Sequence, residues 1–195
     1  MINPLPSFPP LFSTEGWWRS FIAGRLDGES PDEAITRANA ACGLKSREWM
    51  RFRIEGEAVL SVPVAGGAST LKNRPSQEWM LSAAAVREGK KIEATLSTVY
   101  GRTPYFSLIR QDIMPEYKEC HAGEICRNAF LKVNRVLGLD DEDLLKELKR
   151  RMIFSDAVIK SIRACYTGTV HPELSILDIL FKAGPDAIFA LMPSF

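Results

Sequence analysis

Hydrophobic and polar residues alternate most clearly over residues 49–64, and this alternation predicts a β-hairpin. One face of the first strand carries Met50, Phe52 and Ile54. The opposite face carries Trp49, Arg51 and Arg53. Residues 55–57 (Glu-Gly-Glu) supply the turn, and residues 58–64 form the returning strand. Because Pro63 has no amide donor, this second strand is expected at a sheet edge or at a bulge.

Apolar residues at helical spacing dominate the second half of the chain. The clearest stripe lies within residues 124–137 and consists of Cys126, Phe130, Val133 and Leu137. Start and stop residues predict further helices over residues 17–22, 31–42, 90–100, 103–115, 140–151 and 174–184, with one more turn to residue 191. Residues 65–70 are expected to form a flexible loop, and residues 77–86 a third strand.

These patterns predict an α+β fold for residues 1–195. The N-terminal half is expected to hold the hairpin in a small mixed sheet, and the C-terminal half to be helical, packed as one domain. A proline-rich arm over residues 1–13 carries the large hydrophobic residues Leu5, Phe8 and Phe12. Dense proline disfavours a helix or a central strand there, so we expect an extended arm that is ordered only if these side chains dock on the body.

The composition of the 195 residues is that of an ordinary globular protein. Hydrophobic residues make up 46% and charged residues 25%, and the net charge is +1. Such a balanced charge gives no basic surface for nucleic acid or for an anionic membrane. The start of the sequence lacks the pattern of a secretory signal, and no apolar run is long enough to predict a membrane span. We therefore expect a cytoplasmic protein.

Cysteine and histidine spacing does not predict a metal site. The cysteines are Cys42, Cys120, Cys126 and Cys165, and the histidines are His121 and His171. No Cys-x-x-Cys pair is present, so a closed four-ligand zinc site is not expected. Reduced thiols, no metal and no cofactor are the expectation.

Cations near the hairpin form the first candidate site. Arg51 and Arg53 share a strand face, and Lys45 precedes the strand. Guanidinium groups bind phosphates and carboxylates, so these residues, together with Tyr100, form a candidate anion site. The alternative is a solvent-exposed strand whose charges pair with nearby glutamates.

Three other groups each have a functional and a structural interpretation. The loop at residues 66–70, with Lys72, resembles a phosphate-binding loop but lacks the spacing of known glycine motifs. His171 is a candidate general base, while Ser175 and Asp178 fit the start of a helix, where they would form a capping box. The aromatic residues at 100, 105 and 106 are expected either to line a pocket or to belong to the core.

Three segments together resemble a known family. They read Ala-Val-Leu-Ser-Val-Pro-Val at residues 58–64, Val-Tyr-Gly-Arg-Thr-Pro-Tyr-Phe at residues 99–106, and Pro-Glu-Leu-Ser-Ile-Leu-Asp-Ile-Leu-Phe-Lys-Ala-Gly-Pro-Asp at residues 172–186. In this order they are similar to motifs of the WbqC-like family, in particular its Bacteroidetes-type members. The chain departs from the family pattern at Met50, where asparagine is usual. Residues 88–96 also lack the usual tryptophan and histidine.

The resemblance implies a protein accessory to polysaccharide or O-antigen biosynthesis. Its reaction would be transfer of an acyl or aminoacyl group to a nucleotide-linked sugar, with Lys45 and Arg51 holding the phosphates. The alternative is a non-catalytic binding or assembly module that docks a protein partner through the proline-rich arm. The missing tryptophan and histidine favour the module, whereas a cleft that joined Lys45, Arg51 and Tyr100 would favour the enzyme.

Overall fold

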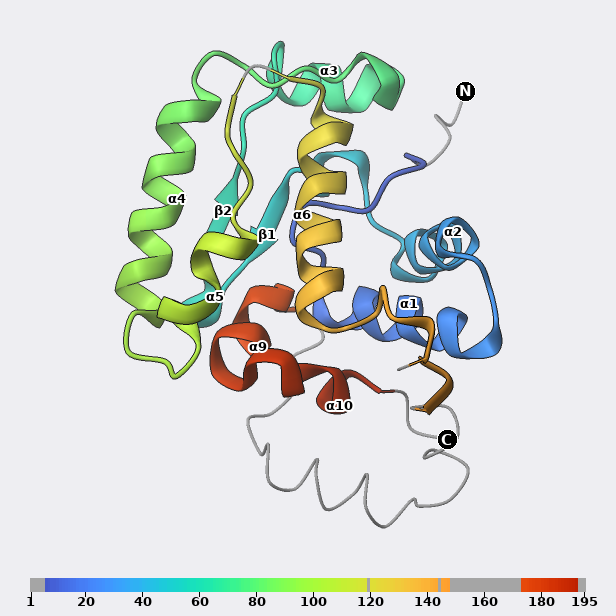
Figure 1. The fold of residues 1–195 in the computed structure, drawn as a ribbon. Coiled ribbons are helices and arrows are strands. Elements are labelled where there is room, and N and C mark those ends of the chain that lie inside the picture. Colours follow the sequence, from blue (N-terminus) through green and yellow to red (C-terminus); the bar gives the residue numbers. More distant parts are fainter. Residues whose placement is uncertain (1–5, 119, 144, 148–172, 193–195) are drawn as a thin grey trace.

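The computed structural model describes residues 6–118, 120–143, 145–147 and 173–192 (Figure 1). Its helices are α1 (Glu15–Asp27), α2 (Pro31–Cys42), α3 (Gly67–Asn73), α4 (Ala85–Tyr100), α5 (Phe106–Ile113), α6 (Ala122–Val136), α9 (Ile176–Ala183) and α10 (Ala187–Leu191). Its strands are β1 (Arg51–Arg53) and β2 (Val59–Ser61). Short 3-10 turns cover Ser46–Glu48, Glu55–Glu57, Ser76–Glu78 and Gly184–Asp186. The fold is therefore α+β, as predicted, while residues 148–172, with the expected helix end at 149–151, Cys165 and His171, lie outside the described residues.

The predicted hairpin is confirmed. β1 and β2 pair antiparallel, with Phe52 opposite Leu60. The side chains of Met50, Phe52 and Ile54 are buried, whereas Arg51 and Arg53 are exposed. Trp49 differs from the prediction because it is fully buried. It ends the 3-10 turn before β1, and its indole N–H donates to the Phe8 carbonyl at 3.0 Å.

Helix starts and ends follow the sequence signals closely in α2 and α6. Ser30 and Glu33 form a capping box at the start of α2, and Gly43 ends the helix in the left-handed region with φ 56°. The predicted stripe of α6 is buried along its whole length. α1 is longer than predicted because Thr14 caps it three residues before Trp17.

Two predicted elements are wrong. The expected loop at residues 65–70 is largely the first part of α3, which begins at Gly67, the second of two glycines with positive φ. Residues 77–86 form no strand. Their backbone groups make isolated hydrogen bonds to several segments and do not pair continuously with one neighbouring strand. Leu81 N–H donates to the Cys120 carbonyl, and Ser82 N–H donates to the Pro63 carbonyl. The helix expected from residue 90 then begins at residue 85.

The N-terminal arm is docked over its described part. Phe8, Leu11 and Phe12 are all buried, and Leu11 N–H donates to the Trp49 carbonyl at 2.8 Å. The Phe12 ring packs edge-on against Phe52, with ring centroids 5.0 Å apart. These side chains belong to the same hydrophobic core as the hairpin and the helices. The condition we set for an ordered arm is therefore met for Phe8 and Phe12, while Leu5 lies outside the described residues.

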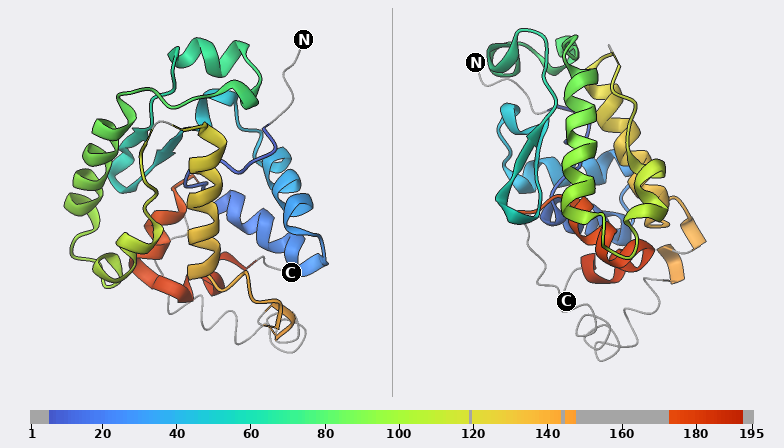
Figure 2. Two further views of the ribbon diagram at one scale, coloured as in Figure 1. Left: turned by 45° about the horizontal axis from the view of Figure 1, so that its top comes forward. Right: turned by 90° about the vertical axis from the view of Figure 1, so that its left-hand side faces the viewer.

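The arrangement of the helices leaves α4 at one side of the molecule. α6 runs through the centre, and the chain between α5 and α6 passes between α4 and α6 (Figures 1 and 2). α1, α9 and α10 lie together at one end of α6. None of the described helices combines the length and apolar character needed to span a membrane.

Candidate functional site

The cations predicted to bind an anion lie on the exposed side of the hairpin and before it. Arg51 and Arg53 are two residues apart on β1, and Arg53 Nη1 lies 3.5 Å from Glu173 Oε2. Lys45 precedes the 3-10 turn before β1, and its backbone N–H donates to Glu48 Oε2 at 2.7 Å. All three side chains are exposed.

Tyr100, the fourth predicted member of that site, is fully buried at the end of α4. Its hydroxyl donates to Asp178 Oδ1 at 2.9 Å and accepts from the Glu55 N–H at 3.0 Å. Burial raises the pKa of this hydroxyl well above its ordinary value, and the charge of Asp178 adds to that rise. Tyr100 therefore stays protonated and belongs to a buried polar cluster, while the three cations are on the surface.

Asp178 is the centre of this buried cluster. Lys182 Nζ lies 3.1 Å from Asp178 Oδ1 and 3.0 Å from Oδ2, and it also lies 3.2 Å from Glu55 Oε2. Partial burial pulls the pKa of Lys182 down, but its bonds to Asp178 and Glu55 raise that pKa above its ordinary value. The cluster thus joins the hairpin turn, α4 and α9 through one buried carboxylate.

The predicted capping box at α9 is absent. Ser175 does cap the helix, since its hydroxyl accepts from Leu177 N–H at 3.2 Å. The backbone N–H of Ser175, however, donates to the Arg53 carbonyl at 2.8 Å, so Asp178 is left to bond Tyr100. Around them, Tyr100 and Phe106 pack on the ring of Phe181, which supports the core interpretation of these aromatic residues.

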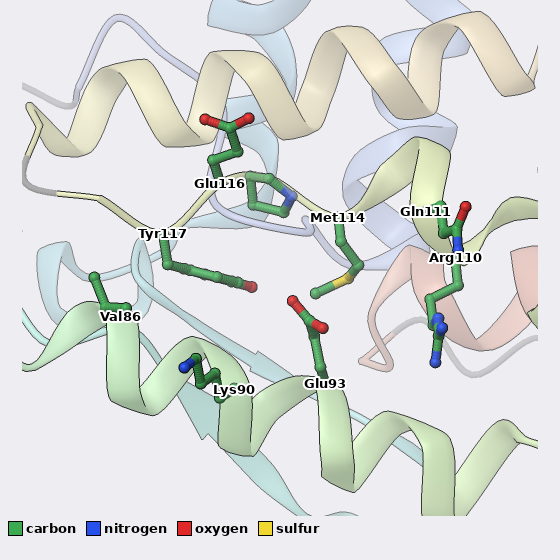
Figure 3. A pocket seen from close by; sticks show the side chains of 9 residues that line it. Val86, Lys90, Glu93, Arg110, Gln111, Met114, Glu116 and Tyr117 are labelled. Atoms are coloured by element: carbon green, nitrogen blue, oxygen red, sulfur yellow. The ribbon is translucent and has the colours of Figure 1, made fainter.

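A cavity of about 510 Å³ lies between α4, α5 and residues 114–117, and we call it the α4–α5 pocket (Figure 3). Lys90 and Glu93 line it from α4, and Arg110 lines it from α5. Met114 and Tyr117 line it from the segment that follows α5. Ligand sites are typically concavities of this size with a few convergent polar groups. A hollow of similar volume lies beside α2, but only the α4–α5 pocket combines two cations with a buried, unpartnered tyrosine hydroxyl among the described residues, so it is the candidate functional site.

Close packing on α4 positions Tyr117 in the pocket. Gly89 is buried within α4, and a Cβ atom there would lie 2.2 Å from Tyr117 Cδ2. The absence of a side chain at Gly89 therefore lets the tyrosine ring lie directly on the helix. Lys132 of α6 holds the same segment by donating to the Met114 carbonyl at 2.6 Å.

The two cations of the pocket differ from their neighbours on α4. Arg87 and Lys91 both pair with Glu88. Within the described ranges, by contrast, no carboxylate forms an ion pair with Lys90 or Arg110. The Arg110 guanidinium lies 5.5 Å from the centre of the Phe106 ring, and its Nη1 lies 3.4 Å from Ser97 Oγ. Neither cation is neutralised by an ion pair among the described residues, although Glu93 and Glu116 also line the pocket.

Tyr117 brings a second unusual group to the pocket. Its hydroxyl oxygen is buried and has no hydrogen-bond partner among the described residues. Burial raises the pKa of this hydroxyl, and the negative charge of Glu93 raises it further. The group is therefore a neutral hydroxyl that retains both its donor and its acceptor capacity.

The sequence interpretation did not identify this pocket. Its charged residues look like ordinary solvated charges, and its two walls are distant along the chain. One signal was present, because a glycine within a helical pattern such as Gly89 often marks a close approach of another segment.

Comparisons of the chain with protein-family models, with curated proteins and with solved structures found no match.

Proposed function

We propose that the protein binds a small organic anion in the α4–α5 pocket. The observation that carries this proposal is the pair of cations, Lys90 and Arg110, that line one pocket from two helices and form no ion pair among the described residues, although Glu93 and Glu116 line it too. Charge-assisted hydrogen bonds from such groups to phosphate or carboxylate are stronger than neutral ones. The apolar side of Met114 and the ring of Tyr117 supply surface for the rest of a ligand.

The motif resemblance supports a more specific version of this proposal. In that version the anion is a phosphate or a nucleotide-linked sugar, and the protein is a WbqC-like accessory of polysaccharide biosynthesis. Binding is proposed and a group-transfer reaction is not, because no side chain in the pocket is placed as a nucleophile next to a general base. This agrees with the alternative of a non-catalytic binding module.

The described part of the arm does not support docking of a protein partner. Its large hydrophobic residues, Phe8, Leu11 and Phe12, are packed into the core. They would have to leave that core before another protein could contact them. The proposal is therefore of a small-molecule partner.

Thermal shift with glucose 1-phosphate and with inorganic phosphate tests the proposal. A ligand present at one hundred times its dissociation constant adds about 2.7 kcal/mol to the free energy of unfolding. For a chain of this size that corresponds to a rise in melting temperature of roughly 5–10 °C. We expect Arg110→Ala and Lys90→Ala to reduce this rise.

Arg87→Ala is the matched control, since Arg87 lies on the same helix but pairs with Glu88 outside the pocket. It should show the full ligand-induced rise. No rise for the unmodified protein with either probe, or an equal rise for all four proteins, would contradict the proposal.

A further inference from the structure

We infer that the anion bound in the α4–α5 pocket carries a hydroxyl group close to its charged group, as a sugar phosphate does. This inference rests on the proposed function and adds a substrate class to it. It is based on Tyr117 and Glu93, the two lining residues to which the proposed binding of an anion by the cations gives no role.

The Tyr117 hydroxyl and the Glu93 carboxylate point toward the same part of the pocket (Figure 3). The hydroxyl has no partner among the described residues, although a buried polar group without a hydrogen bond is costly. Glu93 is three residues after Lys90 on α4, a spacing that often gives an ion pair, but the two do not pair here. The buried tyrosine hydroxyl thus lacks a partner, and the exposed Glu93 carboxylate beside it is able to accept a hydrogen bond from a ligand.

The chemistry of the two groups selects a hydroxyl on the ligand. Glu93, when ionised, only accepts hydrogen bonds, so it repels a second anionic group and requires a donor. Neutral Tyr117 has a proton to donate, so it requires an acceptor. An ammonium group has no acceptor and would leave the tyrosine proton unpaired. A hydroxyl group accepts from Tyr117 and donates to Glu93 at the same time.

Met114 lies beside the tyrosine hydroxyl. The hydroxyl oxygen has almost no solvent exposure, and the Met114 side chain ends beside it and Glu93 (Figure 3). Methionine has three rotatable bonds and adapts readily to a neighbouring group. Access of a ligand to the hydroxyl would therefore require the Met114 side chain to rotate.

Calorimetric titration of the full chain with glucose 1-phosphate and with inorganic phosphate tests the inference. Tyr117→Phe removes only the hydroxyl. It should weaken binding of glucose 1-phosphate by roughly threefold to tenfold, the effect of one neutral hydrogen bond, and leave the affinity for inorganic phosphate unchanged. Arg110→Ala should weaken binding of both probes.

The possible failures are distinguishable. If neither probe binds the unmodified protein, the proposed function fails and the inference fails with it. If both probes bind and Tyr117→Phe alters neither affinity, the inference alone is wrong. A lower melting temperature of Tyr117→Phe with unchanged affinities also overturns the inference, because the hydroxyl would then serve the fold through Glu93.

Discussion

Asp178 shows how a single buried carboxylate connects parts of the chain that are far apart in sequence. It is 4% exposed, and its partners Tyr100 and Lys182 come from α4 and from the next turn of α9. Through Tyr100 it also holds the N–H of Glu55 in the hairpin turn. A role limited to the helix dipole, which the sequence alone favours, would be worth about 1 kcal/mol and would not depend on Tyr100.

Substitution at Asp178 should therefore cost more than a dipole interaction, and its effect should depend on Tyr100. We expect Asp178→Asn to lower the free energy of unfolding by about 1–3 kcal/mol, measured by urea denaturation. The double variant with Tyr100→Phe should cost clearly less than the sum of the two single variants, because Tyr100→Phe removes the hydrogen bond that Asp178→Asn weakens by removing the charge of its acceptor. Costs that add to within about 0.5 kcal/mol would show that the two residues act independently.

Gly89 gives a second prediction at the scale of one residue. Alanine in place of glycine in a helix normally stabilises it by about 1 kcal/mol. Here the added Cβ would overlap the Tyr117 ring at 2.2 Å. We therefore expect Gly89→Ala to lower the melting temperature, and to become neutral or stabilising when Tyr117 is also replaced by alanine. A melting temperature raised by Gly89→Ala alone would mean that Tyr117 does not rest on α4.

The N-terminal arm makes both hydrogen bonds and ring contacts to the body of the protein. The Phe8 carbonyl accepts hydrogen bonds from the Trp49 indole and from the Asn39 amide, while the Phe8 ring packs against Trp79. Replacement of a buried phenylalanine by alanine typically costs about 3–5 kcal/mol. The arm therefore stabilises the body of the protein as well as covering it.

Deleting residues 2–10 should lower the melting temperature by several degrees or more, and Phe8→Ala should produce much of that loss. For a chain of this size, 3–5 kcal/mol corresponds to roughly 6–20 °C. Ser7→Ala is the control, because Ser7 is exposed on the same arm. An unchanged melting temperature after the deletion would refute the docking of the arm.

Elements with their signals inside one short stretch of sequence could be predicted. Residues 31–42 carry both ends of α2, and the alternating pattern of residues 50–54 fixes which side of β1 is buried. The wrong predictions depend on contacts between residues that are distant in the sequence. Residues 77–86 have strand-like composition, yet their backbone bonds go to separate partners near Pro63 and Cys120. No local pattern reports which partner a backbone group will find.

At the scale of the whole molecule, the candidate sites show the same limit. Tyr100 and Asp178 are 78 residues apart. The residues near each one already explain it, Asp178 as part of a helix start and Tyr100 as an aromatic core residue, so the sequence did not predict their contact. The α4–α5 pocket depends on how α4 packs against the chain after α5, with Tyr117 seated on Gly89. Charged residues on helix surfaces usually face solvent, and only tertiary packing shows that Lys90 and Arg110 share a cavity.

A crystal structure of the protein grown with glucose 1-phosphate tests the central claim most directly. The account predicts that the ligand lies in the α4–α5 pocket, with its phosphate beside Arg110 or Lys90 and with a sugar hydroxyl toward Tyr117 and Glu93, which lie between the two cations (Figure 3). Phosphate bound instead on the exposed face of β1, beside Arg51, would contradict the account and favour the site first expected from the sequence.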